Sequence, residues 1–500
     1  MGRGRGSQTQ VATVGTRGGR EDWLQRARKG VADLGLNSYE VGGSLRDEQL
    51  GRTPKDLDIC VVGSELDQLL ARLDQAGKAD RLDVAGKTIG ARLYASWAPK
   101  GGIEFALARK EVSTGQGHKD FAIEAAPDVS LEQDLERRDF TCNALAREIL
   151  PDGSPGKLVD LHGGAEDIKN GVLRAVGPTT IAEDPLRVLR GLARMAKDGS
   201  HPDQQTLRAM QAEISKLGPD GPLSSERIFE ETQKLLSGRY AADALRLARD
   251  AGIFQEAFPE LAPMSGFSQE SQYHDLGVDD HSFQALQRAC EWDAPLSVRW
   301  AALLHDSGKP LVAFRGKDGF LHYYADPDDP EAVSHEEKGA EISSQLLGRL
   351  KAPRDLEEKV ELLVREHMYG QDRAMNKRSA RKNAYKARKM IQTIGRDNIE
   401  ELMLLRRCDA AGKKADLQPG WDDDFIAFET LVRQQMDAPL TTKELAINGH
   451  DLLKLGLKGK EIGTVQRELL QRVVEDPEAN NPDRLNSWAE TLAAKELRRR

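Results

Sequence analysis

Two aspartates, Asp56 and Asp58, stand one residue apart and lead into an apolar run. Side chains of a strand alternate, so both carboxylates are expected to face one way while Leu57 and Ile59 face the core. Paired carboxylates can hold two Mg²⁺ ions, which activate an attacking hydroxyl and neutralise a triphosphate during in-line transfer. Glu104, in another β-like run, can supply a third carboxylate.

A glycine pair precedes these aspartates in the run VGGSLRD, residues 41–47. Glycines directly after a strand let the backbone approach a phosphate, and the amides that open the next helix face an anion. Gly43 is therefore a candidate phosphate contact. A glycine turn or a strand-end aspartate is common by itself, and it is their combination that indicates phosphate chemistry.

Histidines gather in a second region, since six of the ten in the chain lie between residues 274 and 367. At the centre an apolar stretch ends in His305 and Asp306. Imidazole and carboxylate together suit divalent transition metals and leave room for a metal-activated water. A capped helix end is the alternative explanation for an isolated His-Asp pair. The six histidines are His274, His281, His305, His322, His335 and His367.

The formal net charge of −9 weighs against a nucleic-acid partner, but the charge is segregated. Residues 373–389 hold eight Lys or Arg around Tyr385, and the chain ends in three arginines. Phosphate contacts come from local clusters, so an acidic protein can still hold RNA on one basic surface. Solvated helix faces or tails are the alternative. The first twenty residues are also basic, with Arg3, Arg5, Arg17 and Arg20.

Period-two runs, which predict strands, alternate with helical patterns from about residue 21 to 165. Beyond residue 166 nearly all patterns are helical, so the fold class predicted is α+β. The expected strands are Tyr39–Val41, Asp58–Val62, Ala91–Ala95 and Ile103–Ala108, and the expected head helices are Glu65–Gln75 and Arg138–Ile149. The later helices expected are Leu186–Met195, Ser225–Leu236, Ser297–Leu304, Glu336–Leu350 and Ile399–Leu405.

Gly/Pro-rich breaks divide the 500 residues, which exceed what one hydrophobic core usually organises. We expect a disordered basic lead at 1–20, a head at 21–165, a helical neck at 166–265, a fourth region at 266–415 and a helical C-terminal region at 416–500. No apolar stretch approaches the ~20 residues of a membrane helix and no signal peptide precedes the head, so a cytoplasmic protein without a membrane partner is expected. The scattered cysteines are expected to be reduced core thiols: Cys60, Cys142, Cys290 and Cys408.

Three further segments give these motifs a family likeness: Arg137–Thr141 with Asn143, Glu183–Arg187, and Leu223–Ile228. In this order and spacing they resemble the class II tRNA nucleotidyltransferases, the CCA-adding enzymes, and their relatives the bacterial poly(A) polymerases. The resemblance spans residues 38–240. It implies a small polymerase-beta-like nucleotidyltransferase head, a neck with a nucleotide-selecting helix, and a subgroup that carries a downstream HD domain.

The resemblance also implies roles for single residues. Asp56 and Asp58 would bind the metal, with Glu104 as a third catalytic carboxylate, and Asp139 could accept a hydrogen bond from the ribose 2′-hydroxyl. The nucleotide-binding residues implied are Gly43, Arg46, Arg138, Asp139, Asn143, Asp184, Arg187 and Arg190.

Asp184 and Arg187 are three residues apart and would share one helix face. A carboxylate acceptor beside a forked donor can match the base edge of cytosine or of adenine, so protein would replace a nucleic-acid template. Spacing alone also allows Asp184 to be an N-cap, with Pro185 as the first helical residue.

With His281 upstream and Asp409 downstream, the His305-Asp306 pair resembles the HD phosphohydrolases, in which such a set binds the metal. His335 and His367 would be additional ligands or phosphate contacts. The implied metal is Ni²⁺, Mn²⁺ or Co²⁺, or Mg²⁺ as in the head, and the implied activity is that of a phosphatase or a 2′,3′-cyclic phosphodiesterase. The region from residue 416 resembles the part of related enzymes that contacts tRNA, with a packing or dimerisation module as the alternative.

The function expected is therefore template-independent addition of CCA to the 3′ end of tRNA from CTP and ATP, with a second, HD-type hydrolase. A poly(A) polymerase is the runner-up, and CC-only or A-only addition stays open. An HD phosphohydrolase with an RNA-binding head and a non-enzymatic RNA scaffold are the other hypotheses. Both would predict lost carboxylates in the head, where none is missing. Monomer and homodimer are both allowed.

Overall fold

The computed structural model describes residues 18–498, apart from residue 85 and the segments 114–120, 271–275, 370–378 and 412–420. The chain forms two compact units, Met1–Ile228 and Phe229–Arg500. The predictions made for residues 1–17, His274 and residues 373–378 lie outside the described residues. No helix in the described part of the chain is long and apolar enough to cross a membrane.

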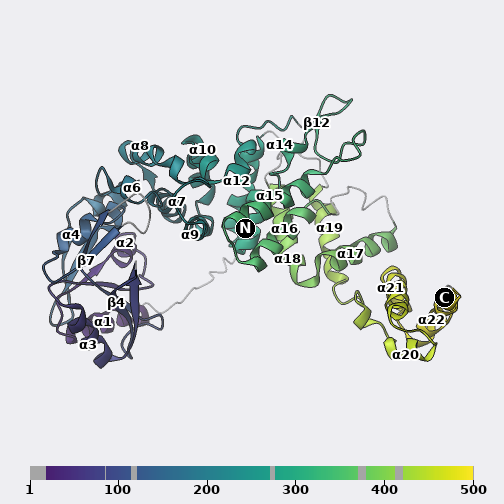
Figure 1. Ribbon diagram of the computed structural model, residues 1–500, viewed down its shortest axis with the longest axis horizontal. Coiled ribbons are helices and arrows are strands. Elements are labelled where there is room, and N and C mark those ends of the chain that lie inside the picture. Colours follow the sequence, from purple (N-terminus) through teal and green to yellow (C-terminus); the bar gives the residue numbers. More distant parts are fainter. Residues whose placement is uncertain are drawn as a thin grey trace, which may run out of the picture. The chain divides into compact units, whose positions relative to one another are not determined.

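A seven-stranded sheet organises the first unit, in the order β3-β4-β5-β2-β1-β8-β9. Its strand β4 is labelled in Figure 1. Within it β2 and β5 run parallel, and their register places Asp58 opposite Glu104. The pairing therefore joins two acidic residues that are distant in sequence. The strands are β1 (Ser38–Val41), β2 (Asp58–Val61), β3 (Lys78–Val84), β4 (Lys87–Tyr94), β5 (Ile103–Leu107), β8 (Leu145–Ile149) and β9 (Pro155–Asp160).

The two faces of this sheet differ. One face packs under α1 (Gly18–Asp33) and α3 (Leu66–Ala76), and Leu57 and Ile59 lie in its apolar core, as predicted. The opposite face carries a smaller apolar cluster that includes Cys60 and Leu135 of α4 (Leu131–Glu136). Strand alternation thus leaves Asp58 and Cys60 on the face with less apolar cover.

Short helices and two small strand pairs complete the first unit. The pairs are β6 (Arg109–Ser113) with β7 (Phe121–Ala125), and β10 (Val172–Leu173) with β11 (His201–Pro202). The helices are α2 (Gly43–Gln49), α5 (Gly164–Asn170), α6 (Thr180–Glu183), α7 (Arg187–Asp198) and α8 (Gln204–Ala212), with α9 (Ser225–Ser237) at the boundary.

The second unit is helical except for a two-stranded hairpin, β12 (Phe314–Arg315) with β13 (Leu321–His322), among the residues that the structure describes. Its first helices surround a core that holds Trp300, Phe254 and Phe283. They are α10 (Ala241–Asp250), α11 (Ile253–Ala257), α12 (Val278–Glu291), α13 (Leu296–Leu304), α14 (Lys309–Val312), α15 (His335–Arg349), α16 (Arg354–Glu366), α17 (Ala380–Ile394) and α18 (Ile399–Ala411).

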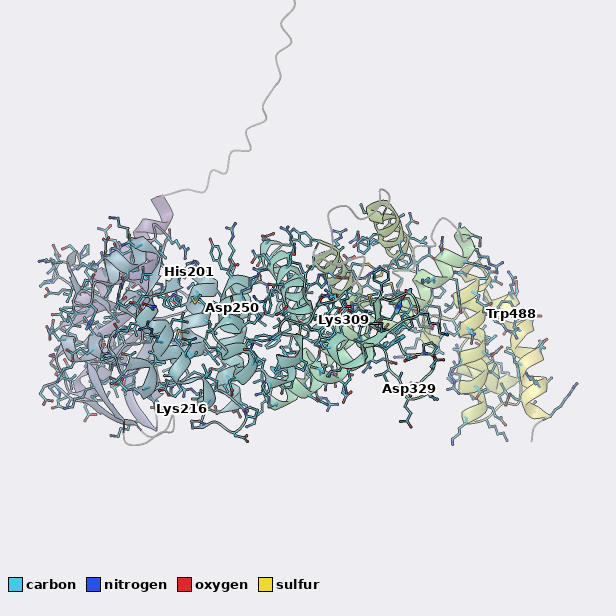
Figure 2. All side chains as sticks on the ribbon, turned by 90° about the horizontal axis from the view of Figure 1, so that it is seen from above. His201, Lys216, Asp250, Lys309, Asp329 and Trp488 are labelled. Atoms are coloured by element: carbon cyan, nitrogen blue, oxygen red, sulfur yellow. The ribbon has the colours of Figure 1, made fainter. Side chains whose placement is uncertain are left out.

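The last helices, α20 (Gly449–Lys454), α21 (Lys460–Glu475) and α22 (Pro482–Leu497), follow α19 (Trp421–Gln434) and build a separate apolar core. Trp488, labelled in Figure 2, packs against this core. The guanidinium groups of Arg472 and Arg484 each lie 5.3 Å from its ring centre.

The α+β class and the five predicted helices between residues 186 and 405 are confirmed. The helix predicted at 138–149 is wrong, because that segment forms a 3₁₀ turn, Thr141–Asn143, and then strand β8. Strand β8 is hydrogen-bonded on both sides, to β1 and β9, so tertiary pairing overrides the helical spacing of its apolar residues. Residues Pro259–Met264 form a 3₁₀ helix. All four cysteines are unpaired and buried, as predicted.

Candidate functional site

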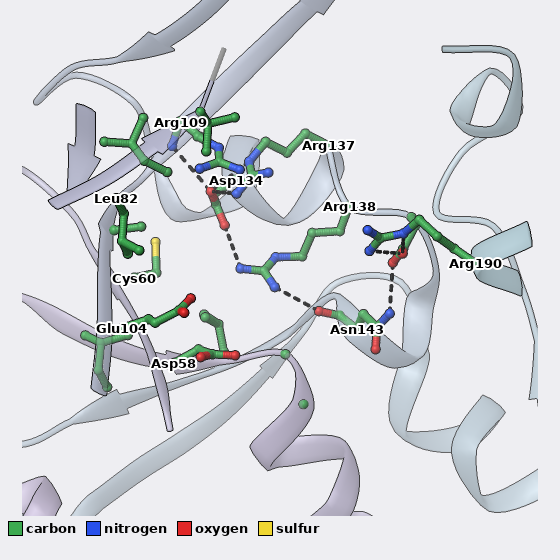
Figure 3. Close-up of a pocket in the computed structure, with 18 of the residues that line it drawn as sticks. Asp58, Cys60, Leu82, Glu104, Arg109, Asp134, Arg137, Arg138, Asn143 and Arg190 are labelled. Atoms are coloured by element: carbon green, nitrogen blue, oxygen red, sulfur yellow. Dashed lines mark hydrogen bonds and ion pairs between the residues drawn. The ribbon is translucent and has the colours of Figure 1, made fainter. Parts of the chain in front are cut away.

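A pocket of about 740 Å³ opens on the less covered face of the sheet. It brings together Asp58, Glu104 and all eight residues predicted to bind nucleotide. Figure 3 shows Asp58, Glu104 and Arg138 among them. Eight arginines and six acidic residues line it, so the cavity is strongly polar. The arginines are Arg46, Arg109, Arg137, Arg138, Arg187, Arg190, Arg194 and Arg227, and the acids are Asp58, Asp83, Glu104, Asp134, Asp139 and Asp184.

The glycine pair forms the start of α2 at the edge of the pocket. Gly42 is the N-cap of this helix and has φ of 72°, a conformation that side chains rarely adopt. A Cβ there would also lie 3.3 Å from Nη1 of Arg138. Glycine at position 42 therefore permits both the turn and the close approach of an arginine.

Asp58 and Glu104 are neighbours on the parallel strands β2 and β5. Burial, followed by the charges of Asp56 and Glu104, raises the pKa of Asp58 to about 6. Arg92 on the adjacent strand forms an ion pair with Glu104. A carboxylate held against two like charges is a favourable ligand for a divalent cation, because the cation would relieve their repulsion.

Asp56 differs from the expectation that it shares the strand with Asp58. Strand β2 begins at Asp58, and Asp56 is exposed in the irregular segment before it. It does not line the pocket, although its charge acts on Asp58.

Asp134, on α4, anchors two arginines of the pocket and was not identified from the sequence. Its carboxylate is 1% exposed and accepts hydrogen bonds from Arg137 Nη2 (2.7 Å) and Arg138 Nη2 (2.9 Å). Burial opposes its ionisation, but the two arginines outweigh this effect and lower its pKa. The spacing of three and four residues from Asp134 to the arginines was the available signal.

Asp139 is fully engaged with neighbouring groups. Its Oδ2 accepts from Nε (2.9 Å) and Nη2 (2.6 Å) of Arg190, and its Oδ1 accepts from the Asn143 amide (2.9 Å) and the Phe140 backbone N–H (2.8 Å). Burial works against the ionised form, yet these donors lower the pKa to about 2. Arg46, buried beside them, donates to Asn143 Oδ1 at 2.5 Å. A ribose hydroxyl could bind Asp139 only by replacing one of these donors.

Asp184 and Arg187 line the same pocket, but they do not share a helix face as predicted. Asp184 is the C-cap of α6, and α7 begins only at Arg187. The N-cap interpretation is also wrong: Leu186 holds that position, and Asp184 Oδ1 accepts from the Leu186 N–H at 3.2 Å in a local turn. Pro185, between them, separates the two helices.

Asp184 and Arg187 are each held in place by hydrogen bonds to other residues. Arg227 of α9 donates to Asp184 Oδ2 at 3.2 Å. Arg187 is 8% exposed and donates to the carbonyls of Thr180 (2.9 Å) and Arg137 (2.7 Å). These contacts position both side chains at the pocket wall. Arg227, within a motif recognised in the sequence, was not identified as a site residue.

The second unit brings the predicted HD residues together. Asp306 Oδ2 lies 3.5 Å from His281 Nε2 and 3.4 Å from His305 Nε2. Two triads that could hold a cation share Asp306: one with His281 and His305, the other with His335 and His367. Asp409 Oδ1 is 3.1 Å from His281 Nε2. All six side chains are nearly inaccessible to solvent.

Helix ends orient three of these imidazoles. His305 and His367 are the C-caps of α13 and α16, and their Nδ1 atoms lie 3.0 and 2.7 Å from the carbonyls of Ala302 and Val364. His335, the first residue of α15, directs Nδ1 to the carbonyl of Tyr323 at 3.1 Å. A carbonyl can only accept, so each Nδ1 carries a proton. Whenever one of these rings is neutral, it therefore presents a bare Nε2, as in metal-binding histidines.

The charge state of these rings fits cation binding. Burial lowers the pKa of His335 to about 4 and that of His367 to about 3, so both are neutral near pH 7. The Nε2 atom of His335 has no hydrogen-bond partner among the described residues. Burial also disfavours the charged form of His305, but Asp306 and Asp409 outweigh it and raise its pKa to about 9. The same two carboxylates would stabilise a metal cation in place of that proton.

Lys309 supports the centre from beside it. Its Nζ donates to Asp306 Oδ2 (2.7 Å) and to Gln269 Oε1 (2.8 Å) and lies over the ring of Tyr323. The Tyr323 hydroxyl donates to the Gln269 carbonyl at 2.5 Å. These contacts connect the carboxylate shared by both triads to the segment that precedes α15.

Three family models match separate parts of the chain. The model of the "Poly A polymerase head domain" matches residues 38–174 and that of the "Probable RNA and SrmB- binding site of polymerase A" matches residues 201–265. The HD domain model matches residues 278–411. The pocket and the histidine centre therefore lie in differently classified segments.

Solved structures resemble the fold along nearly its full length. The CCA-adding enzyme of Bacillus stearothermophilus, solved in complex with CTP, has a TM-score of 0.63 at 20% identity and covers 96% of this chain and 99% of its own. The CCA-adding enzyme of Thermotoga maritima, solved with tRNA, has a TM-score of 0.56 at 19% identity over 94% of each chain.

Curated bacterial relatives are more similar in sequence. The multifunctional CCA protein of Ectopseudomonas mendocina (strain ymp) is 35% identical over 341 residues, which are 67% of this chain and 75% of that protein. The protein of the same name from Pseudomonas fluorescens (strain Pf-5) is 31% identical over 440 residues, 86% of this chain and 96% of its own. With this identity along nearly the whole of a relative, the chain belongs to the multifunctional CCA protein family.

Proposed function

We propose that this protein adds CCA to the 3′ end of tRNA from CTP and ATP in the pocket of the first unit. The observation that carries the proposal is the pocket itself, where the acidic pair Asp58 and Glu104 lies in one cavity with eight arginines. An anionic triphosphate with a divalent cation matches that charge pattern. Members of the family to which the chain belongs are named for CCA.

Asp58 and Glu104 would hold Mg²⁺, with Asp56 approaching from the exposed segment before β2. When bound, the metal lowers the pKa of the attacking hydroxyl and neutralises charge on the phosphates. The remaining work falls to the chain. Arg138, held by Asp134, would contact the triphosphate, and Arg190 would do the same once a ribose hydroxyl replaces it at Asp139.

Base selection would use the wall formed by Asp184 and Arg187. The carboxylate accepts from the exocyclic amine that cytosine and adenine share, and the guanidinium donates to the adjacent ring nitrogen. Uracil and guanine present a carbonyl where the amine should be, which would leave buried polar groups unpaired. Arg227 and the carbonyls of Thr180 and Arg137 would keep the two groups in place.

A tRNA that lacks its 3′ CCA tests this activity when it is incubated with CTP alone, with ATP alone, and with both. We expect two cytidines from CTP, and a terminal adenosine only after them. Repeated addition of adenosine would instead identify a poly(A) polymerase. On tRNAs that end in the discriminator base and in CC, incorporation of cytidine but never of adenosine would identify a CC-only enzyme. Incorporation of adenosine but never of cytidine would identify an A-only enzyme.

In the second unit, we propose a hydrolase of phosphate ends, either 2′,3′-cyclic phosphates or phosphate monoesters. Imidazole-rich donors favour Ni²⁺, Mn²⁺ or Co²⁺ over Mg²⁺. His281, His305, Asp306 and Asp409 would hold one ion, and His335 and His367 would hold a second through the shared Asp306. When bound, the metal supplies an activated water and neutralises phosphate charge.

Metal content and activity test this centre separately. We expect purified protein to retain transition metal that is lost in His305→Ala, and to hydrolyse 2′,3′-cyclic AMP only when loaded. His335→Ala should lose one metal equivalent and keep the other. An equal metal content in wild type and both variants would refute the centre.

A further inference from the structure

Arg92, on strand β4, lies next to the proposed cation site of the first unit. The register of the sheet places Arg92 directly opposite Glu104 of β5, and Glu104 is itself opposite Asp58 of β2. Residues that face each other on neighbouring strands lie on the same side of a sheet. One cation and two carboxylates therefore follow each other across three adjacent strands, and Figure 3 shows the two acidic side chains.

The guanidinium group of Arg92 is directed at Glu104, although a second carboxylate is available on the other side. Asp80, on the edge strand β3, is the other cross-strand neighbour of Arg92. Arg92 Nη2 nevertheless donates to Glu104 Oε1, and Asp80 forms its ion pair with Lys78 at 3.2 Å. Among the described residues, no ion pair joins Arg92 to Asp80. The side chain of Arg92 thus extends towards the pocket and away from the edge of the sheet.

Gly102, directly before β5, leaves room for this orientation of Arg92. It has φ of 78°, in the left-handed region that favours glycine. A Cβ at this position would lie 2.9 Å from Cγ of Arg92, which is too close for the stem of the arginine to stay where it is. The glycine before β5 therefore permits the pairing of Arg92 with Glu104.

Exposure to solvent distinguishes this ion pair from the arginine pairs of Asp134. The side chains of Arg92 and Glu104 are 43% and 40% exposed, whereas that of Asp134 is 1% exposed. An exposed ion pair contributes little to stability, and water can hydrate each partner when the other leaves. A buried carboxylate such as Asp134 would lose far more if its arginines left. The pair of Arg92 and Glu104 is therefore one that another cation can separate.

We infer that Arg92 is the counter-ion of Glu104 in the empty site, that a divalent cation replaces it there, and that Arg92 thereby keeps the affinity of the site for free cation low. A guanidinium group and a divalent cation compete for one carboxylate, because its negative charge attracts both. Arg92 does not line the pocket and acts through Glu104, so it is a positioning residue. The inference rests on the proposed nucleotidyl transfer and adds how firmly the site holds its cation. A weakly held cation can arrive with the triphosphate and leave with the pyrophosphate.

Binding of Mn²⁺, a paramagnetic substitute for Mg²⁺, tests the inference in the full-length protein without nucleotide. Electron paramagnetic resonance measures free Mn²⁺, and the binding that Asp58→Asn removes from each protein defines the site in the first unit. In Arg92→Gln, we expect the Kd of this site for Mn²⁺ to fall about tenfold, because a neighbouring positive charge is lost. Arg92→Thr, a second uncharged variant that suits a strand, should behave in the same way. Arg92→Lys keeps the charge, so its Kd should stay within about threefold of wild type.

The Mg²⁺ requirement of CCA addition gives a second measurement. In Arg92→Gln, the Mg²⁺ concentration for half-maximal rate should fall about tenfold, while kcat at saturating Mg²⁺ stays within about threefold. Arg81→Gln is the matched control, because Arg81 of β3 also forms an exposed ion pair, with Asp74 of α3 at 2.6 Å. This pair lies on the opposite face of the sheet, which α3 covers. Arg81→Gln should change neither the Kd for Mn²⁺ nor the Mg²⁺ requirement.

Three results would overturn the inference. An unchanged or higher Kd for Mn²⁺ in the uncharged Arg92 variants would show that Arg92 does not compete with the cation. An equal gain in Arg81→Gln would show a general effect of surface charge. Absence of Asp58-dependent Mn²⁺ binding, in wild type and in Arg92→Gln alike, would show that no cation replaces Arg92. Failure of the proposed function is distinguishable, because Mn²⁺ binding would then still respond to Arg92→Gln while wild type added no CCA.

Discussion

In the pocket of the first unit, buried carboxylates pair with arginines, whereas in the second unit the carboxylate of Asp306 lies among four histidines. Asp134 and Asp139 are both held by guanidinium groups, and further arginines line the cavity. Asp306 contacts the ammonium group of Lys309, and its other close neighbours among the described residues are histidines. The first site is therefore rich in arginine, whereas the second is rich in imidazole.

This difference indicates which kind of ligand each site is suited to bind. A surplus of arginine suits an anion that arrives with its own cation and leaves again, as a nucleoside triphosphate does. Imidazoles with Nδ1 fixed to carbonyls suit a cation that stays in place between turnovers. One chain can thus carry two metal-dependent centres that differ in the kind of ligand each is suited to bind.

Replacing one acidic residue in each site should have the largest effect, because each replacement should abolish the activity of one site and spare that of the other. Asp58→Asn should lower CCA addition on the order of thousands-fold and leave cyclic phosphate hydrolysis intact, because a metal ligand contributes several kcal/mol to the transition state. Asp306→Asn should do the reverse. Both rates would be measured on each variant with folding checked by circular dichroism, and a joint loss in either folded variant would contradict separate sites.

Nucleotide selection should respond less strongly. Asp184→Ala and Arg187→Ala should each narrow the preference for CTP and ATP over UTP and GTP by about 5- to 150-fold, as expected when about 1–3 kcal/mol per polar group is lost. Arg227→Ala, which releases Asp184 without removing it, should cost about tenfold. The measurement is kcat/KM for all four nucleotides. Wild-type preference in the Asp184 and Arg187 variants would place base selection elsewhere.

The pairing of Asp139 with Arg190 should also make the stability of the first unit depend on pH. The pKa of Asp139 is lowered to about 2, so its contribution of roughly 2 kcal/mol is present above the unfolded pKa near 4 and is lost as pH falls towards 2. Asp139→Asn should be less stable than wild type at pH 7, with the difference closing below pH 4. Hydrogen exchange of peptides from the first sheet measures this, and a pH-independent difference would refute the ion-pair explanation.

The smallest effect expected is the pH dependence of CCA addition. The pKa of Asp58 is raised to about 6, so its protonated form is favoured below that pH and competes with the metal. The rate at low Mg²⁺ should fall roughly tenfold per pH unit below about 6. Higher Mg²⁺ should move this acid limb to lower pH. An acid limb that does not respond to Mg²⁺ would belong to a different group.

The candidate residues could be found from the sequence largely because their order along the chain is characteristic. His281 and Asp409 are 128 residues apart, yet their side chains lie 3.1 Å from each other. Chemistry alone could not have paired them, and the motif order did. Asp134 was missed because a carboxylate before two arginines is common on helices and its burial depends on the sheet behind it.

The strands that were not predicted show a similar limit. Strands β3 and β9 lie at the two edges of the sheet, and along β3 exposed positions predominate. An edge strand that does not bury a full face has no clean alternation of apolar residues to read. The error at β8 had the opposite cause, since its apolar residues are buried between two partner strands and their spacing is ambiguous.

The hydrogen bonds of Arg388, a buried residue of α17, limit where the chain can be truncated. A fragment ending at residue 411, where the HD family match ends, would lack Gln435, Val474 and Glu475, which accept hydrogen bonds from Arg388. A buried arginine without them would have to hydrate or leave the interior, and α17 would loosen with it. We therefore expect that a fragment of the second unit must continue past Glu475 to retain hydrolase activity. An insertion into α21 should likewise loosen α17.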